Sequence, residues 1–325
     1  MPQVTMAQLA TRAGVCKATI SLALRNDPRI SAEVRQRVRR VADELGYTRN
    51  PLVDELMSQL RRSRVANFQR TIALLNAHRD RRVFTDNPTV PLWVDGCQRR
   101  ARHLGWHIDE FWLHNPELDG ESLLRILLAR GIRGAVVIGA FNVVWIPARF
   151  RPLWDEIACV VTGIRTRSPA LSFTCVDHHN LVLDAMTRLR ALGYRRPGLV
   201  LSQTVDRVTD GRFTCGMWLA QQALPEADRV PALTGFPTDD DGAAPFSDWY
   251  RQHRPDAVLT LHTVVRDWLG ALGREAPRDL GLVHLERTRE TAWWAGMEQH
   301  NDVAGEAAID LLGGMLHNHE YGVPA

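Results

Sequence analysis

The sequence contains a single lysine, Lys17, and no recognisable catalytic motif. No G-x-S-x-G element, P-loop or dinucleotide-binding fingerprint occurs in it, and no nucleophile stands beside a base at a catalytic spacing. These absences argue against the hydrolases, nucleotide-binding enzymes and dehydrogenases that depend on such motifs. We therefore expect a protein that is not an enzyme.

The five cysteines are an odd number, are widely spaced and form no C-x-x-C pair; they are Cys16, Cys97, Cys159, Cys175 and Cys215. This pattern indicates neither a disulfide framework nor a zinc site, and it favours a reducing compartment. The N-terminus lacks an apolar signal region, and no apolar run is long enough to cross a bilayer. We expect a cytoplasmic protein that contacts no membrane and carries no cofactor.

Histidines and aspartates gather at three places without the partners that a metal site needs. His178-His179 and His317-Asn318-His319 have no acidic or cysteine ligand at a suitable spacing, so we expect solvated loop residues there. Asp239-Asp240-Asp241-Gly242 resembles the start of a calcium loop but lacks the later ligands, which favours a polar turn. No metal site is predicted.

Positive charge is concentrated near the N-terminus. Residues 1–64 contain twelve Lys and Arg against six Asp and Glu, whereas the rest of the chain contains 28 against 31. The formal net charge of +3 therefore hides a basic head on a slightly acidic body. A basic module attached to a larger domain is typical of nucleic-acid binding, and a length of 325 residues suggests two or three domains.

The N-terminal residues carry the pattern of two short helices joined by a tight turn. Thr5 can cap the first helix, and Gly14 can end it because glycine adopts left-handed backbone angles without a steric cost. A second helix is expected from about residue 17 to residue 24, with one apolar face. Such a pair is either a helix-turn-helix, whose second helix enters the DNA major groove, or two ordinary core helices.

A third helix and a further helical segment follow. Ser31 can cap a helix over residues 32–45, which has an apolar face and an outer face of arginines: Arg35, Arg37, Arg39 and Arg40. In the segment 48–60, Leu52, Leu56 and Leu60 stand in line at helical spacing. A basic three-helix head followed by a further helix favours the helix-turn-helix interpretation over two ordinary core helices.

This order of parts resembles the lactose-repressor (LacI/GalR) family of bacterial transcription regulators. The matching residues stand in one register; they are Val4, Thr5, Ala10, Ala13, Gly14, Val15, Thr19, Ser21, Arg35, Val38, Leu45, Gly46, Tyr47, Asn50, Pro51 and Leu56. The resemblance implies an all-α helix-turn-helix DNA-binding head followed by a hinge helix. It also implies a homodimer on a palindromic double-stranded DNA operator.

The resemblance further implies which residues contact DNA. Base edges would be read by Lys17, which can donate to guanine, and by Ala18 and Leu22 through apolar contact. Phosphate contacts are assigned to Thr5, Thr19, Ser21, Arg25, Ser31 and Arg35. In the hinge, the minor groove is assigned to Asn50, Val53 and Leu56. Leu56 of each subunit would wedge into the central base step, although a buried core leucine is the alternative.

From residue 71 the pattern changes to short apolar strands that alternate with amphipathic helices. Strands are expected at 71–75, 107–113, 134–138, 158–162, 173–176, 198–202, 230–233, 257–261 and 281–285. Helices are expected at 92–104, 121–130, 180–192, 212–223, 246–254, 264–272 and 303–317. The alternation predicts parallel sheets covered on both faces, and so many strands favour two lobes with a ligand cleft at the carboxyl ends of the strands.

The family resemblance extends over this body less closely, through Val176-Asp177, Leu192–Pro197, Arg254–Val258 and Gln299–Leu312. It implies an α/β two-lobed effector domain like that of the type I periplasmic binding proteins. The family's effector positions correspond here to Asn76, Arg212, Phe236, His262, Glu286 and Gln299. Family members usually continue with another short strand where this sequence stops, so a truncated end or an unusually short second lobe is expected.

The resemblance also sets the expected domain boundaries. The helix-turn-helix domain would cover residues 1–47, and the hinge helix and linker 48–64. The N-lobe of the effector domain would cover 65–162, rejoined by about 291–320, and the C-lobe 163–290.

The sequence therefore predicts a DNA-binding transcriptional regulator, a repressor by family habit, modulated by a small polar effector such as a sugar. Two alternatives stay open. The family usually has Asn-Asp where His262-Thr263 stand and Asp where Glu286 stands, so the protein would be a regulator without an effector if these departures abolish binding. The second alternative is a solute-binding protein of the same fold.

Overall fold

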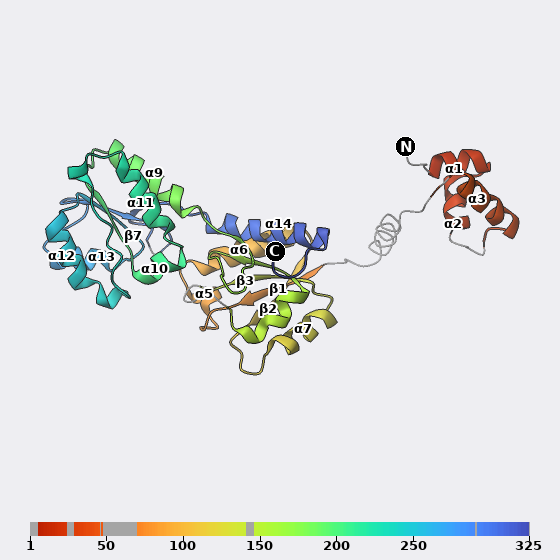
Figure 1. Ribbon diagram of the computed structural model, residues 1–325, viewed down its shortest axis with the longest axis horizontal. Coiled ribbons are helices and arrows are strands. Elements are labelled where there is room, and N and C mark those ends of the chain that lie inside the picture. The colour runs from red at the N-terminus through yellow and green to blue at the C-terminus, as the bar shows by residue number, and fades with distance from the viewer. Residues whose placement is uncertain are drawn as a thin grey trace. The chain divides into compact units, whose positions relative to one another are not determined.

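The computed structural model describes residues 6–24, 29–45, 47, 70–140, 146–289 and 291–324. The chain divides into two compact units, with the boundary between Phe68 and Gln69 (Figure 1). Within the described residues, no helix combines the length and the apolar character that a bilayer crossing requires.

The first unit contains the three predicted helices, α1 (Met6–Ala13), α2 (Lys17–Leu24) and α3 (Ala32–Glu44). They share one core made of Leu9, Ala10, Ala13, Ile20, Ala23, Val38 and Ala42. Gly14 has a φ of +68°, which ends α1, and Ser31 Oγ accepts a hydrogen bond of 3.4 Å from the Val34 amide at the start of α3. The expected helix-turn-helix and third helix therefore form around one apolar core.

The second unit begins with a five-stranded parallel sheet in the order β2-β1-β3-β4-β5. Its strands are β1 (Thr71–Asn76), β2 (His107–Trp112), β3 (Gly134–Ile138), β4 (Ala158–Thr162) and β5 (Ser172–Thr174). We call this sheet and its helices the first lobe. Residues of the strands point alternately to the two faces, so each face has its own apolar core.

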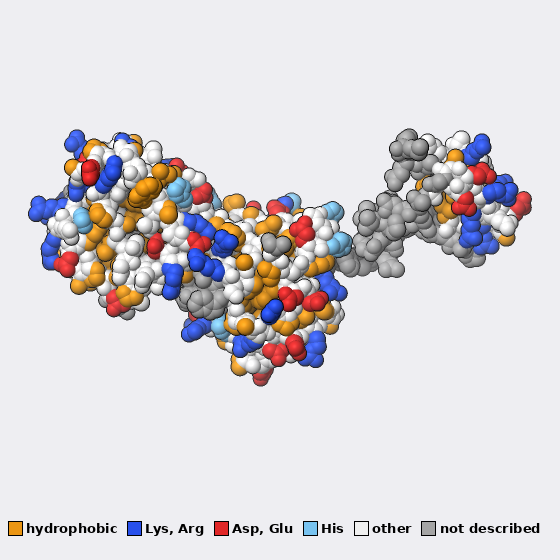
Figure 2. Space-filling view, in the orientation of Figure 1, with side chains coloured by type: hydrophobic (Ala, Val, Ile, Leu, Met, Phe, Trp, Pro, Cys, Tyr) orange, Lys and Arg blue, Asp and Glu red, His pale blue; other side chains and the backbone are white. Residues whose placement is uncertain are grey.

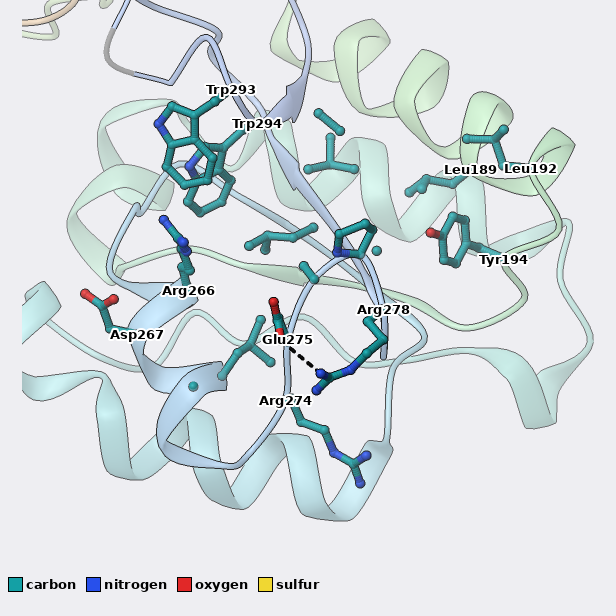
Figure 3. A pocket seen from close by; sticks show the side chains of 18 of the residues that line it. Leu189, Leu192, Tyr194, Arg266, Asp267, Arg274, Glu275, Arg278, Trp293 and Trp294 are labelled. Atoms are coloured by element: carbon teal, nitrogen blue, oxygen red, sulfur yellow. Dashed lines mark ion pairs between the residues drawn. The ribbon is translucent and has the colours of Figure 1, made fainter.

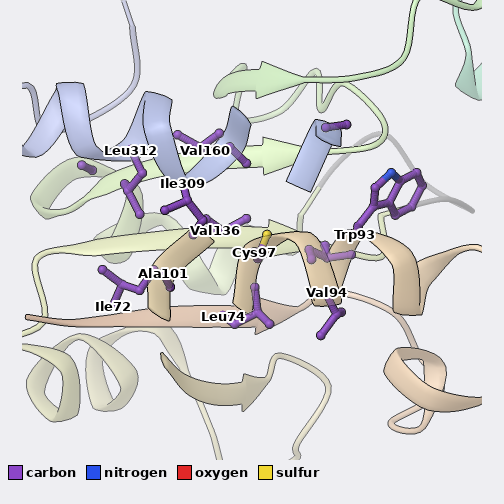
Figure 4. Packing of buried hydrophobic residues seen from close by; sticks show 14 of the residues in the cluster. Ile72, Leu74, Trp93, Val94, Cys97, Ala101, Val136, Val160, Ile309 and Leu312 are labelled. Carbon is purple, nitrogen blue, oxygen red and sulfur yellow. The ribbon is translucent and has the colours of Figure 1, made fainter. Parts of the chain in front are cut away.

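Two pairs of helices cover this sheet. The helices α6 (Val90–His103) and α14 (Asn301–Asn318) pack on the face that carries Ile72, Leu74, Val136 and Val160 (Figure 4). The helices α7 (Gly120–Ala129) and α8 (Arg151–Glu156) pack on the opposite face. Because α14 comes from the end of the chain, the first lobe is completed by residues that follow the second lobe in sequence.

The second lobe is a smaller parallel sheet in the order β6-β7-β8-β9. Its strands are β6 (Pro197–Val200), β7 (Ala257–Thr260), β8 (Gly281–His284) and β9 (Ala295–Gly296). Two helices, α9 (His178–Ala191) and α11 (Arg212–Gln222), pack on one face, and α12 (Ala243–His253) and α13 (Val265–Ala271) on the other. The two-lobed α/β architecture is as predicted.

Several elements differ from the expectation. Residues 230–233 form no strand but only an isolated bridge between Leu233 and Val200, because Pro231 has no amide to donate to a ladder. The strand β5 pairs with β4, so the first lobe extends past residue 162, where its boundary was expected. Asp239-Asp240-Asp241 forms a short 3-10 helix, and α5 (Val83–Asp86), α8 and α10 (Gln203–Val208) were not foreseen.

The cysteines are all free and fall into two groups. Cys97 and Cys159 are buried in the two cores of the first lobe, and burial raises the pKa of the Cys97 thiol to about 12. Cys16, in the turn before α2, and Cys215, on α11, are exposed. Cys175 is half-buried in the segment between β5 and α9.

The helices α6 and α14 lie in backbone contact, which glycine makes possible. A Cβ atom at Gly305 would overlap the carbonyl oxygen of Trp93, and a Cβ atom at Gly96 would overlap the carbonyl oxygen of Asp302. Beside this contact, Arg99 forms ion pairs of 2.8 Å with Asp302 and 2.5 Å with Glu306. The close approach fixes the beginning of α14 against the first lobe.

The substitution Gly305→Ala is expected to lower the free energy of unfolding by about 1–3 kcal/mol, since the added methyl group has no space against the backbone of α6. Gly314→Ala on the same helix is the control. Nothing lies within 4 Å of its added Cβ, so alanine there is expected to stabilise by about 0.5–1 kcal/mol. Denaturant unfolding measures both, and equal effects at the two positions would contradict the proposed contact.

Candidate functional site

The head carries a helix-turn-helix with a basic third helix. Arg37, Arg39 and Arg40 of α3 are exposed, and Arg35 is half-buried. Figure 2 shows Lys and Arg side chains on the visible face of the head, among fewer acidic ones. The exposed arginines thus lie on the third helix, which packs against the two helices that the turn at Gly14 joins.

Only part of the predicted DNA contacts falls within the described structure. Thr19 and Leu22 lie on α2, where the Thr19 hydroxyl is 3.2 Å from the Cys16 sulfur, and Ser31 and Arg35 lie at the start of α3. The backbone of Lys17, Ala18 and Ser21 is part of α2, whereas their side chains lie outside the described structure. Five predicted contacts fall outside the described residues altogether: Thr5, Arg25, Asn50, Val53 and Leu56.

A cavity of about 290 Å³ lies between the two lobes of the second unit. The first lobe contributes the loop after β1, the start of α6 and the end of β4; the second lobe contributes the starts of α9, α10 and α11. The lining residues are His78, Asn87, Thr89, Trp93, Gly163, Ile164, His178, Thr204, Val205, Val208, Thr209, Phe213, Leu261, Glu286 and Gln299. A concave site of this size with apolar walls and a few polar groups is suited to a small ligand.

A chain of hydrogen bonds crosses this cavity's wall from one lobe to the other. The Trp93 indole on α6 donates to Asn301 Oδ1 at 2.9 Å, and Asn301 Nδ2 donates to Glu286 Oε1 at 2.8 Å. Glu286 follows β8, and burial raises the pKa of its carboxyl group. Gln299 Nε2 donates to the Leu285 carbonyl at 2.9 Å. Asn301, at the beginning of α14, therefore joins a side chain of the first lobe to one of the second lobe.

Four of the six predicted effector residues lie away from this cavity. Asn76 is buried at the end of β1 and bonds within its own loop, donating to the Arg81 carbonyl and accepting from the His78 amide. Arg212 donates to the Cys175 sulfur at 3.1 Å, pairs with Asp210 and lies over the Phe173 ring. Neither side chain lines the cavity, because each is committed to neighbouring structure.

Phe236 and His262 lie in the core of the second lobe rather than on the cavity. Their rings contact each other with centroids 5.6 Å apart, and Phe236 also meets Trp268. His262 Nε2 accepts from the Ser202 amide at 2.8 Å, and its Nδ1 lies 2.6 Å from Asp239. Positions just after a strand can face either the cleft or the core, and here both face the core. Glu286 and Gln299 are the two predicted residues that line the cavity.

His178 is a lining residue that the sequence reasoning missed. The expectation of a solvated loop histidine was wrong: His178 begins α9 and is 7 % exposed, and its ring lies 4.5 Å from that of Phe213. The signal was present in the sequence, because Leu181, Val182 and Ala185 follow His178 at the spacing of one buried helical face. The residues described form no cluster of three or more His, Cys, Asp or Glu able to hold a metal ion.

A larger hollow of about 1040 Å³ lies within the second lobe alone. Figure 3 shows Arg266 beside Trp293 and Trp294, and the ion pair of 3.0 Å between Arg278 and Glu275 on the other side. Because a single lobe forms this hollow, a ligand there would not by itself distinguish one arrangement of the lobes from another. The interlobe cavity is therefore the better candidate for a site that controls conformation.

Comparison with known proteins matches the head to one family. Residues 5–50 match the family described as "Bacterial regulatory proteins, lacI family". The HTH-type transcriptional regulator IpsA of Corynebacterium glutamicum is 25% identical over 313 residues, covering 87% of this chain and 83% of that protein. The head therefore carries the match to the lacI family, and the similarity to IpsA extends over most of the chain. The chain is a DNA-binding transcriptional regulator.

Solved structures agree with the fold of this regulator. The transcriptional regulator CelR in complex with cellobiose superposes with a TM-score of 0.58 at 20% identity, covering 99% of this chain and 96% of that chain. The lac repressor dimer bound to operator and the anti-inducer ONPF gives a TM-score of 0.55 at 15% identity, covering 98% and 94%. The helix-turn-helix head and the two-lobed effector-domain fold are thus confirmed.

Replacing Glu286 by Gln is expected to change how the stability of this regulator depends on pH. Because the folded-state pKa of Glu286 is raised, its favourable contribution is complete below the unfolded pKa and is lost as pH rises through the folded pKa. Glutamine cannot ionise, so above the unfolded pKa of a glutamate, about 4.3, the unfolding free energy of the variant should increasingly exceed that of the native protein as the pH rises.

Denaturant unfolding at each pH measures this difference. Glu226→Gln, which removes an exposed carboxylate elsewhere on the second lobe, is the control and should leave the profile nearly unchanged. Parallel profiles for the native protein and Glu286→Gln would show that Glu286 is not the source of the effect. Titration of His178 is common to both proteins and cancels in the comparison.

Proposed function

We propose that this regulator binds a palindromic operator as a homodimer and that a small polar molecule in the interlobe cavity changes its affinity for that operator. The observation that carries the proposal is the match of residues 5–50 to the lacI family on a folded three-helix head. Selection of bound fragments from genomic DNA tests it. Recovery of a palindromic site is expected, and the absence of any preferred site at low salt would refute the proposal.

The DNA-binding part is supported by the geometry of the head. The second helix of a helix-turn-helix enters the major groove. The family resemblance assigns Lys17, Ala18 and Leu22 on this helix to base edges, and the surrounding hydroxyl and arginine side chains to phosphates. A two-fold operator requires two heads, which is why a homodimer is proposed. Phosphate contacts make the affinity fall steeply with salt concentration.

The effector part is supported by the way the cavity is shared. A ligand can shift an equilibrium only through contacts that differ between its states, and contacts with both lobes differ whenever the lobes move. Glu286 and Gln299 reach the cavity from the second lobe and Trp93 from the first. Cellobiose in the CelR complex and ONPF in the lac repressor complex show that such folds take small molecules.

A regulator without an effector is the second candidate, since Asn76 and Arg212 are bonded to neighbouring groups and away from the cavity. Thermal-shift screening with sugars and sugar phosphates separates the two. Stabilisation by a compound that also changes operator affinity supports the proposal, whereas binding of none favours the second candidate.

The substitution Lys17→Ala is expected to weaken binding to the recovered operator about 10- to 100-fold, because a bidentate base contact is worth about 1–3 kcal/mol. Arg190→Ala, which removes one positive charge from the exposed side of α9, is the control and should change the affinity less than about twofold. Gel-shift titration at a fixed salt concentration measures both affinities. Equal losses would show that Lys17 contributes only its positive charge and makes no base contact.

The substitution Leu56→Ala tests the proposed minor-groove contact of the hinge. Loss of the wedge is expected to reduce both operator affinity and the bend of the operator, because intercalation of an apolar side chain unstacks and kinks the duplex. Circular-permutation gel shifts measure the bend. A variant that keeps full affinity and full bend would show that Leu56 is instead a core residue.

A further inference from the structure

One carboxylate of the second lobe lies between two arginines, one from each lobe. Asp210 precedes α11, and its two oxygens pair with different guanidinium groups. Oδ1 accepts from Arg167, which lies in the first-lobe loop between β4 and β5, and Oδ2 pairs with Arg212 at 3.4 Å. The Asp210 carboxylate therefore links the two lobes through a network of three charges.

The backbone presents this carboxylate in an unusual conformation. Asp210 has a φ of +54°, in the short turn that joins α10 to α11. Residues other than glycine adopt left-handed angles at a cost, although aspartate and asparagine tolerate them better than most. A residue keeps such angles where the surrounding contacts hold it, and ligand clamps and switch regions are common places for it.

Arg212 ties the same network to the segment by which the chain leaves the first lobe. Its guanidinium lies over the Phe173 ring of β5, 5.7 Å from the ring centroid, and donates to the Cys175 sulfur at 3.1 Å. A cation–π contact requires the charge to lie within about 6 Å of the ring. Because Phe173 belongs to the first sheet and Arg212 to the second lobe, separation of the lobes would break this contact.

The network lies beside the interlobe cavity without lining it. Thr209, the residue before Asp210, lines the cavity, and so does Ile164, which stands three residues before Arg167. A movement of the lobes that reshapes the cavity must therefore also change the distance between Arg167 and Asp210. The cavity itself stays free for a ligand while the network is intact.

The expected strength of the network is modest. The side chains of Asp210 and Arg212 are 22 % and 23 % exposed, but that of Arg167 is 64 % exposed. Exposed ion pairs contribute little, and salt screens them further, although several linked charges contribute more than an isolated pair. A contribution of this size biases the arrangement of the lobes, yet a ligand can still overcome it.

We propose that Arg167, Asp210 and Arg212 form an electrostatic latch that holds the two lobes in the arrangement described here and opens when the lobes separate. In the proposed function, the latch sets part of the free energy that an effector must supply. The latch itself requires neither DNA nor a ligand, so it can be tested on the unliganded full chain.

Cys175 reports whether the latch is closed. Its thiol is half-buried under Arg212, and burial raises its pKa, so alkylation is slow while the lobes are together. Arg167→Gln removes the first-lobe partner of Asp210. The rate at which iodoacetamide alkylates Cys175, measured by mass spectrometry, should rise about two- to fivefold, because the separated lobes are then more populated.

The direction of this change separates lobe movement from a direct effect of charge. Removing a positive charge near a thiol disfavours the thiolate and would by itself slow alkylation. The other cysteines serve as internal controls. Cys215 is exposed and should react at its native rate, whereas Cys97 and Cys159 are buried and should stay unmodified while the protein is folded.

A matched control and a double variant identify the pair. Arg165→Gln removes the same charge from the same loop, but Arg165 lies 5.6 Å from Phe173 within its own lobe, so the Cys175 rate should be unchanged or lower. Asp210→Asn keeps the shape and tolerates the positive φ, and it should accelerate the reaction. Combining Arg167→Gln with Asp210→Asn should give no further increase, since both remove one pair.

Salt provides a test without substitution. Raising sodium chloride from about 0.05 M to about 0.5 M shortens the range of electrostatic interactions from more than 10 Å to about 4 Å. The native Cys175 rate, divided by that of Cys215, should rise toward the rate of Arg167→Gln. The rate of Arg167→Gln should change less.

Four results would overturn the latch. They are a native or slower Cys175 rate in Arg167→Gln, equal acceleration in Arg165→Gln, additive effects in the double variant, and acceleration that extends to Cys97 and Cys159, which would mean unfolding. None of these measurements involves an operator or an effector. Failure of the latch therefore leaves the proposed function standing, and failure to recover an operator leaves the latch standing.

Discussion

Backbone contact between α6 and α14 is the constraint on which the rest of the effector domain depends. Gly96 and Gly305 permit it, and the contact seals one face of the first sheet with a helix that follows the second lobe in sequence. The same contact places Asn301, the first residue of α14, against the Trp93 indole and the Glu286 carboxyl group. The packing that completes the first lobe thus also positions Asn301 for its hydrogen bond to Glu286 of the second lobe.

The two parts of the molecule use electrostatics in opposite ways. The head exposes arginines on α3, which suits a polyanion in water where charge is cheaply solvated. The cavity contains no lysine or arginine among its described lining residues, and the pKa shifts of His178 and Glu286 favour the neutral forms of these two side chains. Discrimination there depends on the geometry of individual hydrogen bonds, because no net charge is available to attract or repel a ligand.

The sequence predicted the architecture well where burial is uniform. Strands β3 and β4 agree with the expectation residue for residue because their residues are all buried and, apart from Thr162, carry no polar side chain. Residues 230–233 look equally apolar, yet Pro231 keeps them out of the ladder. The strand β9 has only two residues, too few to show any periodicity.

The site was harder to predict than the fold, because family positions name a place along the chain but not the direction of a side chain. Glu286 and Gln299 reach the cavity, whereas Phe236 and His262 are buried against each other inside the second lobe. His178 was read as part of a polar histidine pair, although the Asp177 cap and the apolar residues after it indicate a buried helix start. The contact of Trp93 with Asn301 joins residues 208 positions apart and follows from no local pattern.

The positions of the cysteines allow the native protein to be labelled with dyes at two exposed thiols. Cys97 and Cys159 are enclosed in apolar cores, where a thiolate is strongly disfavoured, so maleimides should not react with them. Cys16 lies beside α2 of the head and Cys215 lies on the second lobe, and both are open to solvent. A donor and an acceptor dye attached to these two cysteines would report the distance between the head and the second lobe by energy transfer, without a cysteine being introduced.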